Sequence, residues 1–425
     1  MKIVFYADAI GQLYNCIAIA QQLRQMGHSC LFLVDSSYSQ IIEEYKFECV
    51  TIRTNPSESA KQAWDQLVNS GVKYWRKKSI DQIKGYILPY YSLIVESSLA
   101  ANSNIEHVLK TIDYDVLCVD DVVTYPAVVK SSKPWVRIVS CFETEIQDDE
   151  IPPHLSDFST HEAGEWKSFE LAFHESIKEV HQKYNMFLKR NGVEELPLGR
   201  LLNPSPYLNL LLTPKSIAYQ RKEPLSQKFV YLNASVRVSP SESNSNNIFF
   251  DVKYQNYPLI YLSYGSMGHA DFEFTNRQLQ SLKNKSYRVI ASVGNEFISE
   301  YRDLSDNIQL VPFTFQPDII KQADVVIFHG GNNTFNEVLY FGKPSIVIPF
   351  AWDGFNVASR VQQLGLGIYV PRYSESVFYL DKAVNRLLNN KEMIDKLAVI
   401  SEVLQKEPGS EQAAYSIAQI ANKYS

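Results

Sequence analysis

The chain has 425 residues but only five cysteines, and no two of them form a C-x-x-C pair. These are Cys16, Cys30, Cys49, Cys118 and Cys141, and most lie inside apolar runs such as DVLCVDD and HSCLFLV. Buried, reduced thiols are therefore expected, and a disulfide framework is not.

The sequence also lacks an excess of basic charge and any long hydrophobic run. It has 41 Lys and Arg against 47 Asp and Glu, a formal net charge of -6, so no global positive field would attract nucleic acid or an anionic membrane. No stretch approaches the roughly 18 uninterrupted apolar residues of a membrane-spanning helix. The N-terminal MKIVFYADAIGQ makes a poor signal peptide and a good first strand. Together these features predict a cytoplasmic globular protein that binds neither nucleic acid nor a membrane.

Short apolar runs alternate with helical or polar stretches along most of the chain. Runs of strand length occupy residues 2–7, 29–35, 115–121, 134–140, 207–213, 228–233, 258–266, 287–294, 323–331 and 344–350. Strands that alternate with helices predict parallel sheets with helices on both faces. A chain of this length favours two domains. The expected fold class is therefore α/β, with two doubly wound halves in tandem.

A polar segment, SPSESNSNN at residues 239–247, interrupts this alternation and has no apolar residue to bury. We place the domain boundary there. The prediction is an N-terminal domain over residues 1–238, a linker over 239–252 and a second domain over 253–408. Residues 409–425 are expected to form a helix that crosses back to the first domain.

The stretch FHGGNNTFNE, residues 328–337, joins a buried strand to a helix. Gly330 and Gly331 permit a sharp turn and a close approach of the backbone to a ligand. Asn333 or Thr334 suits the N-cap of the helix that follows. The positive end of such a helix is a ready site for phosphate.

Two further side chains of this stretch extend the predicted site. His329 adds a hydrogen-bond donor beside the helix end. Glu337 lies one turn along the helix. Its carboxylate can accept hydrogen bonds from the two hydroxyls of a ribose, whereas it would repel a phosphate, so the ribose is the expected partner. Since ligands of such folds bind at the carboxyl edge of the parallel sheet, a nucleotide site is predicted here.

The same region resembles the donor-binding signature of the family 1 UDP-glycosyltransferases. The resemblance rests on H329-G-G-N-N-T-F-N-E337, G342-K-P, P349-F-A-W-D353, Asn356 and R360-V-Q-Q-L-G-L-G367. FTFQ at 313–316 resembles the W-x-P-Q element of the plant members, and YLSYGSMG at 261–268 resembles the strand and turn that begin the donor domain. The resemblance implies the GT-B architecture, with two Rossmann-like domains facing across a cleft. It also implies transfer of a hexose from a UDP-sugar with inversion at the anomeric carbon.

The roles that the resemblance implies cover base, ribose, diphosphate and sugar. Phe313 takes the place of the tryptophan that stacks on uracil, Glu337 holds the ribose, and Asp353 reaches hydroxyls of the sugar. The full implied donor set is Phe313, Gln316, His329, Gly331, Asn333, Thr334, Glu337, Asp353 and Ser266, of which His329, Asn333, Thr334 and Ser266 meet the diphosphate. The family fold needs no metal or other cofactor, because His329 and the helix end would neutralise the leaving diphosphate. Gly354 replaces a family glutamine, which leaves the choice of sugar open, with glucose expected.

The first half departs from the family pattern at its catalytic base. Gln12 stands where the family has a histidine, and an amide has no basic site near neutral pH. DVVTYPA at 121–127 resembles an element of bacterial macrolide glycosyltransferases that puts the family aspartate at Asp121, with Asp120 as the competing alignment. Either Asp121 acts as the base itself, or the acceptor is acidic enough to need little help.

The acceptor is expected to be a small lipophilic molecule, such as a phenol, a flavonoid-like compound or a xenobiotic. Aromatic residues gather in one stretch of the first half, namely Trp64, Trp75, Tyr86, Tyr90 and Tyr91, and GYILPYY is a candidate wall of the pocket. Two alternatives stay open. Gln12 and Gly354 favour a UDP-sugar-binding protein that has lost catalysis, and a UDP-sugar epimerase of similar architecture would need acid or base residues that the sequence does not identify.

Overall fold

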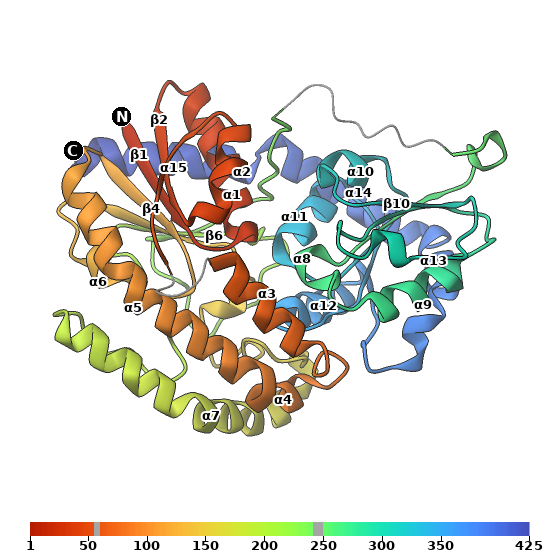
Figure 1. Cartoon of the computed structure of the whole chain (residues 1–425), viewed down its shortest axis with the longest axis horizontal. Coiled ribbons are helices and arrows are strands. Elements are labelled where there is room, and N and C mark those ends of the chain that lie inside the picture. Colours follow the sequence, from red (N-terminus) through yellow and green to blue (C-terminus); the bar gives the residue numbers. More distant parts are fainter. Residues whose placement is uncertain (55–59, 241–249, 425) are drawn as a thin grey trace.

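The computed structural model describes residues 1–54, 60–240 and 250–424, which form two parallel sheets surrounded by helices (Figure 1). The first sheet has the order β3-β2-β1-β4-β5-β6-β7 and the second the order β10-β9-β8-β11-β12-β13. Neighbouring strands are parallel throughout both sheets. The prediction of two doubly wound halves is therefore confirmed. The predicted boundary segment, 239–247, lies outside the described residues except for 239 and 240.

The strands of the first sheet are β1 (Lys2–Ala7), β2 (Ser29–Val34), β3 (Glu48–Thr51), β4 (Val116–Asp120), β5 (Trp135–Val139), β6 (Leu208–Leu211) and β7 (Phe229–Tyr231). Its helices are α1 (Ile10–Gln25), α2 (Ser39–Glu44), α3 (Ala60–Gly71), α4 (Ser79–Gln82), α5 (Leu88–Thr111), α6 (Pro126–Val129) and α7 (Ala163–Arg190).

The strands of the second sheet are β8 (Leu259–Ser263), β9 (Arg288–Ser292), β10 (Ile308–Val311), β11 (Val325–Phe328), β12 (Ser345–Val347) and β13 (Gly367–Tyr369). Its helices are α8 (Gly265–Gly268), α9 (Phe272–Leu282), α10 (Gln316–Gln322), α11 (Asn332–Tyr340), α12 (Gly354–Gln363), α13 (Leu380–Leu388) and α14 (Lys391–Lys406), and α15 (Gly409–Tyr424) ends the chain.

Three strands were not predicted, and all three lie at an edge of a sheet. β3, β10 and β13 are three or four residues long, and each has partly exposed residues. An edge strand packs against fewer neighbours, so its sequence lacks the long buried apolar run that identified the inner strands.

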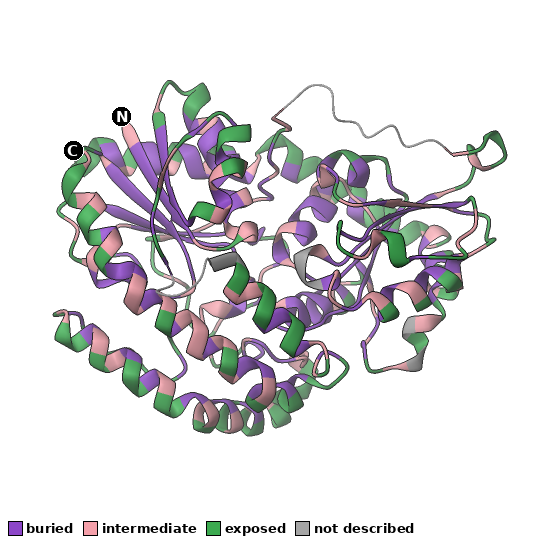
Figure 2. Ribbon diagram, viewed as in Figure 1, coloured by how far each residue is buried: buried purple, intermediate pink, exposed green. Residues whose placement is uncertain are grey.

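The two faces of the first sheet pack against different helices. Ile3 and Phe5 of β1 share one core cluster with residues of α1 and α15, whereas Val4 and Tyr6 share the other with residues of α5. α15 packs against α1, and its Ile417 is fully buried there. The inner strands of both sheets are buried along most of their length (Figure 2).

In each sheet the strand order reverses beside the first strand, between β1 and β4 and between β8 and β11. Such reversals open a crevice at the carboxyl ends of the strands, where ligands of doubly wound folds bind. The register pairs Ala7 with Asp120 in the first sheet and Ser263 with Phe328 in the second. Asp8, Asp121, Tyr264 and His329 therefore follow directly at the two reversals.

The carboxyl edges of the two sheets face each other across a polar contact surface. Asn332 Nδ2 at the start of α11 donates to the carbonyl oxygens of Ser140 (2.9 Å) and Leu212 (2.8 Å), which follow β5 and β6. Asn333 Nδ2 donates to the carbonyl oxygen of Gly11 in the first turn of α1. The two predicted nucleotide and acceptor regions thus lie opposite one another.

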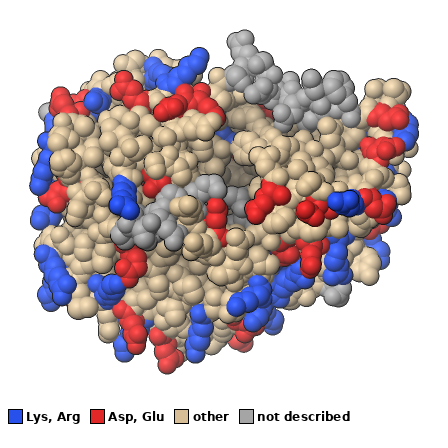
Figure 3. All heavy atoms as spheres, viewed as in Figure 1, with Lys and Arg blue, Asp and Glu red and all other residues tan. Residues whose placement is uncertain are grey.

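Charged side chains of both signs are interspersed on the face shown in Figure 3, with no large patch of a single sign. Within the described residues, no helix is both long enough and apolar enough to cross a membrane.

Candidate active site

The start of α11 is the centre of the candidate donor site. β11 ends at Phe328, and Gly330 then adopts φ 90°. A Cβ at Gly330 would lie 2.6 Å from the carbonyl oxygen of Gly354, so only glycine fits this turn. Asn333 or Thr334 as N-cap was a wrong prediction, because the helix begins at Asn332 with Gly331 as its N-cap.

The reason is that the side chains of this turn have other partners. Asn332 and Asn333 reach across to the first half, and Thr334 Oγ1 accepts a hydrogen bond from Gln316 Nε2 at 3.0 Å. Among the described residues, no side chain caps the first turn of α11. Its free N–H groups and positive dipole end are therefore available to an anion.

Glu337, the predicted ribose residue, lies one turn further along α11 and is only 2% exposed. Its Oε2 accepts from Gln316 Nε2 at 2.6 Å, so Gln316 joins Thr334 and Glu337 in one network. Burial raises the pKa of Glu337, against the lowering effects of Arg237 and Gln316. The structure thus brings together three residues of the predicted donor set.

Arg237 is a member of this site that sequence reasoning missed. Its Nη1 donates to Glu337 Oε1 at 3.0 Å, and its Nε donates to Tyr45 Oη at 3.1 Å. The guanidinium lies over the ring of Tyr14, 3.9 Å from the centroid, and 5.1 Å from that of Phe315. An isolated basic residue in the otherwise apolar ASVRV, directly before the polar segment, was the available signal.

Arg237 is held in place by the neighbouring backbone. Gln21 of α1 donates through Nε2 to the carbonyl oxygen of Val238 and accepts from its N–H, both at 2.9 Å. The Arg237–Glu337 ion pair is almost fully buried, with side chains 7% and 3% exposed. A first-half residue therefore reaches into the predicted ribose site of the second half.

His329 lies beside α8, where a Cβ on Gly265 would come within 2.9 Å of its Cε1. Burial lowers the pKa of His329 to about 4, and the nearby Arg372 and His269 lower it further in the same direction. The ring is therefore uncharged at neutral pH. An uncharged ring would act on a diphosphate as a hydrogen-bond donor, a role that stays a prediction, and its buried Nδ1 has no partner among the described residues.

The remaining donor residues lie apart from this network. Phe313 is 58% exposed before α10. Asp353 Oδ2 accepts from the N–H of Phe142 in the first half at 2.8 Å, and burial raises the pKa of Asp353. Ser266 lies in α8, but its side chain is outside the described part of the chain.

The two candidate aspartates of the first half face opposite sides of the sheet. Asp120 points to α1, where its Oδ2 accepts from Asn15 Nδ2 at 3.2 Å, and its Oδ1 accepts from Ser140 Oγ at 2.8 Å. Asp121 points to the other face, where its Oδ2 accepts from Tyr125 Oη at 2.6 Å. Burial raises the pKa of both, that of Asp120 to about 7.

Gln12 lies in the first turn of α1, next to the Gly11 carbonyl that α11 contacts. Its Oε1 is buried without a partner. Asp8, which ends β1, has a buried Oδ1 that is also unpartnered. Sequence reasoning missed Asp8, although its position directly after a buried strand was a signal.

The predicted aromatic wall packs against the loop before α12. Trp352 lies 3.7 Å from Tyr90 and 6.3 Å from Trp64 between ring centroids. Trp75 and Tyr86 are fully buried and belong to the core. The partly exposed Trp64, Tyr90 and Trp352 are the members that a ligand could reach.

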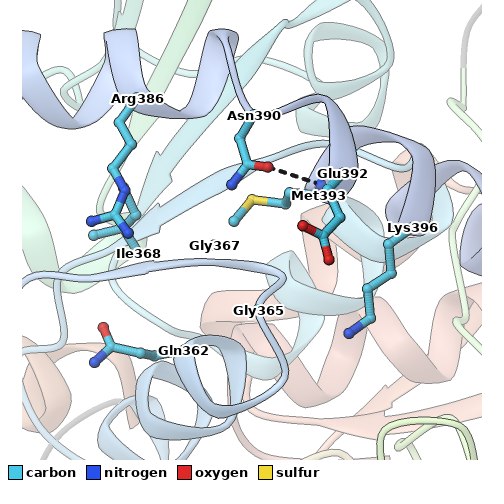
Figure 4. Close-up of a pocket in the computed structure, with 9 residues that line it drawn as sticks. All are labelled: Gln362, Gly365, Gly367, Ile368, Arg386, Asn390, Glu392, Met393 and Lys396. Carbon is cyan, nitrogen blue, oxygen red and sulfur yellow. Dashed lines mark hydrogen bonds between the residues drawn. The ribbon is translucent and has the colours of Figure 1, made fainter.

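A separate surface cavity of about 440 Å³ lies between α12, edge strand β13, α13 and the start of α14 (Figure 4). It is lined by Gln362, Gly365, Gly367, Ile368, Arg386, Asn390, Glu392, Met393 and Lys396. Asn390 Oδ1 accepts from the N–H of Met393 at 3.0 Å, and Lys396 Nζ donates to the carbonyl oxygen of Leu364 at 2.6 Å. These contacts hold the ends of α12 and α14, and none of the lining residues belongs to the predicted donor set.

Residues 259–413 match the family model described as the glycosyltransferase family 28 C-terminal domain. The chain is 31% identical over 196 residues to an uncharacterized UDP-glucosyltransferase, YojK, of Bacillus subtilis, a match that covers 46% of this chain and 48% of that protein. It is 22% identical to the NDP-glycosyltransferase YjiC of the same organism, over 96% of this chain and 94% of the relative. The chain thus spans about half of one relative and nearly all of the other.

Solved structures of the same fold cover nearly the whole chain. The glycotransferase of kitacinnamycin superposes with a TM-score of 0.73 at 17% identity, over 99% of this chain and 98% of that one. The glycosyltransferase VinC in complex with dTDP gives a TM-score of 0.67 at 15% identity, with both chains covered completely. The chain therefore has the GT-B fold, and the relatives and the family model support a bacterial family 1 glycosyltransferase.

Proposed function

We propose that the protein transfers a hexose, with glucose expected, from a UDP-sugar to a hydroxyl group of a small lipophilic acceptor, with inversion at the anomeric carbon. The observation that carries the proposal is the uncapped first turn of α11 beside the Gln316–Thr334–Glu337 network. Free N–H groups at a helix start suit a diphosphate. A buried carboxylate one turn away suits the hydroxyls of a ribose.

The reaction is a single in-line displacement. The acceptor oxygen forms a bond to the anomeric carbon while the bond from that carbon to the diphosphate oxygen breaks, and its electron pair leaves with UDP. The α11 N–H groups and the neutral His329 would stabilise the leaving diphosphate by hydrogen bonds. The acceptor proton must go to a group of the first half, because the Gln12 amide cannot accept it.

The aromatic rings at the contact of the two halves support an apolar acceptor. Trp64, Tyr90 and Trp352 offer partly exposed ring surface near the Asp353 loop. Flat, apolar molecules with a hydroxyl group, such as phenols and flavonoid-like compounds, suit such a wall. Modification of natural products and detoxification of xenobiotics are the corresponding roles.

The test is incubation of the purified protein with UDP-glucose and a panel of phenols and aliphatic alcohols, followed by mass spectrometry and assignment of the anomer by NMR. A β-glucoside is the expected product, since UDP-glucose carries the α configuration. UDP release without any glycoside would overturn transfer to these acceptors. Parallel reactions with other UDP-hexoses and with dTDP-glucose measure the selectivity for donor.

Gln12 favours a second candidate, a UDP-sugar-binding protein without transfer activity. Such a protein would bind UDP-glucose in calorimetry and yield neither UDP nor glycoside with any member of the panel. Transfer by the wild-type protein to even one acceptor would exclude it.

A further inference from the structure

The carboxyl ends of three neighbouring strands bring three aspartates into line in the first half. Tyr6 is in register with Leu33 of β2, and Ala7 with Asp120 of β4. Asp35 lies two residues after Leu33, and Asp121 lies one residue after Asp120. Asp8, directly after β1, therefore lies between Asp35 and Asp121, at the reversal of strand order where ligands bind.

Side chains alternate along β1, so Asp8 continues the face of Tyr6. The Tyr6 ring packs against Tyr125 at 5.1 Å between centroids, and the two hydroxyl groups are 3.0 Å apart. Tyr125 in turn donates to Asp121. This is the face covered by α5, with Tyr90 and Tyr91, and not the face of α1. Asp8 and Asp121 thus point toward the aromatic side, whereas Asp120 does not.

The aspartates differ in how their oxygens are used. Asp121 accepts from the N–H of Val122 through Oδ1 and from Tyr125 through Oδ2, both at 2.6 Å. Asp35 Oδ1 accepts from the N–H of Ser37 at 3.0 Å and from its hydroxyl at 2.6 Å. Asp8 Oδ1 is buried and has no partner.

A second unpartnered acceptor lies in the first turn of α1, four residues after Asp8 in the chain. The Oε1 of Gln12 is buried without a donor as well. A buried polar atom without a partner destabilises the protein unless a ligand supplies the missing hydrogen bond. Both atoms are acceptors, so the missing group is a donor, and the hydroxyl of an acceptor substrate is such a group.

We propose that Asp8 is the general base that removes the proton from the acceptor hydroxyl, with Gln12 as a positioning residue. This inference rests on the proposed function. The acceptor O–H proton passes to Asp8 Oδ1, the oxygen forms its bond to the anomeric carbon, and the electron pair of the broken carbon–oxygen bond leaves with the diphosphate. Asp121, with both oxygens engaged, then orients Tyr125 and Tyr6 beside Asp8.

The electrostatic surroundings fit this role. Burial raises the pKa of Asp8 well above its usual range, and the charges of Asp121 and Asp35 raise it further, while Thr54 acts in the opposite direction. Tyr6, Tyr38 and Tyr125 also face this carboxyl group. A base works best when its pKa lies near the working pH, where it is largely ionised yet still binds a proton well.

The central experiment compares Asp8→Asn with the wild type on an aliphatic alcohol and on 4-nitrophenol, with UDP-glucose as donor. We expect kcat for the alcohol to fall by about 10²–10⁴-fold, the usual contribution of a general base. The loss for 4-nitrophenol should be much smaller, because that acceptor ionises without help. UDP affinity, measured by calorimetry, should stay unchanged. Asp35→Asn is the matched control, since it removes a neighbouring carboxylate whose Oδ1 is already engaged, and it should retain transfer.

Several results would overturn the inference. Equal kcat for Asp8→Asn and the wild type on the alcohol would remove Asp8 from the reaction and leave the proposed function intact, as would an equal loss on both acceptors. If Asp8→Asn fails to fold, the same comparison is made with Asp8→Ser. The alcohol should again lose far more than 4-nitrophenol, and an equal effect on both acceptors would overturn the inference. A wild-type protein that binds UDP and transfers to no acceptor would overturn both proposals.

Discussion

Replacement of Glu337 by glutamine tests the donor site most directly, because it keeps the shape of the side chain and removes its charge. The carboxylate is 2% exposed and accepts from both Arg237 and Gln316. If it also accepts from the ribose hydroxyls, its loss removes hydrogen bonds to a charged group. Such bonds contribute about 1.5–3 kcal/mol each, so UDP should bind about 10- to 150-fold more weakly.

Glu337→Gln also leaves Arg237 buried without its counter-ion. Removal of one partner of a buried pair lowers the free energy of unfolding by about 3–5 kcal/mol. This effect must be separated from the loss of a ligand contact. Arg237→Met provides the second background, since the methionine keeps apolar contact with Tyr14 and Phe315 and leaves no buried cation. Calorimetry then measures UDP affinity in the wild type, both single variants and the double variant.

The outcome of this cycle depends on what Glu337 touches. A ribose contact predicts that Glu337→Gln weakens UDP binding in both backgrounds, and that 2′-deoxy-UDP loses less than UDP. If Glu337 serves only to pair with Arg237, the substitution has no effect on UDP affinity in the Arg237→Met background. That result, with both proteins folded by circular dichroism, would refute the ribose assignment.

Three further predictions concern the first half and its contact with the second. The pKa of Asp120 is about 7 in the folded protein, against 3.8 for the free group, a difference of about 3. The protonated Asp120 therefore contributes fully to the free energy of unfolding below pH 4, and this contribution is lost as the pH rises to 7. The free energy of unfolding of Asp120→Asn, relative to that of the wild type, should therefore rise by up to about 4 kcal/mol between pH 4 and pH 8. Urea unfolding measures this difference, and a difference that does not change with pH would contradict the prediction. Asn332→Ala removes the hydrogen bonds to the buried Ser140 and Leu212 carbonyl groups, and Leu212 keeps only the longer one from Asn336. The free energy of unfolding should therefore fall by about 1–3 kcal/mol, and an unchanged denaturation midpoint would show that the contact contributes nothing. Trp352→Ala removes a ring surface worth about 0.5–1.5 kcal/mol, so KM for phenols should rise roughly two- to tenfold at constant UDP affinity, whereas an unchanged KM would place the acceptor elsewhere.

The inner strands and the donor motifs could be predicted from the sequence because each depends on residues that are neighbours in the chain. A buried parallel strand needs a continuous apolar run, and residues 3–7 and 325–328 show one. The turn at Gly330 is likewise local, since its φ of 90° excludes other residues. The fold class followed from these features, whereas the position of the donor site stays a prediction.

The partners of the motif residues could not be predicted, because they lie between 143 and 203 residues away in the chain. Asn356 accepts from the N–H of Leu155 at 2.9 Å and donates to the carbonyl oxygen of Pro153 at 3.1 Å. Arg360 Nε donates to the carbonyl oxygen of Ile217 at 2.7 Å. Both belong to the stretch that resembles the donor signature, yet here they join the two halves. Only the three-dimensional packing separates such residues from those that face the nucleotide site.

Arg237 and Asp8 escaped prediction for a different reason. Each is a single charged residue whose meaning depends on what the other elements bring to it, Glu337 in the first case and Asp121 in the second. A single charged residue beside an apolar run is a weak signal of function in a sequence. Only a structure shows whether the charge is buried and which group is its partner.

The contact between Asn333 and Gly11 links donor and acceptor chemistry through one short piece of backbone. Asn333 lies in the first turn of α11, where the diphosphate is proposed to bind, and its amide donates to the Gly11 carbonyl. A Cβ on Gly11 would lie 3.5 Å from Asn333 Nδ2, in ordinary contact, so the first turns of α1 and α11 are close neighbours. Asp8 precedes Gly11 by three residues, and Gln12 follows it. A base at the end of β1 is therefore held near the leaving group without a histidine on α1, because α11 fixes the start of α1 directly.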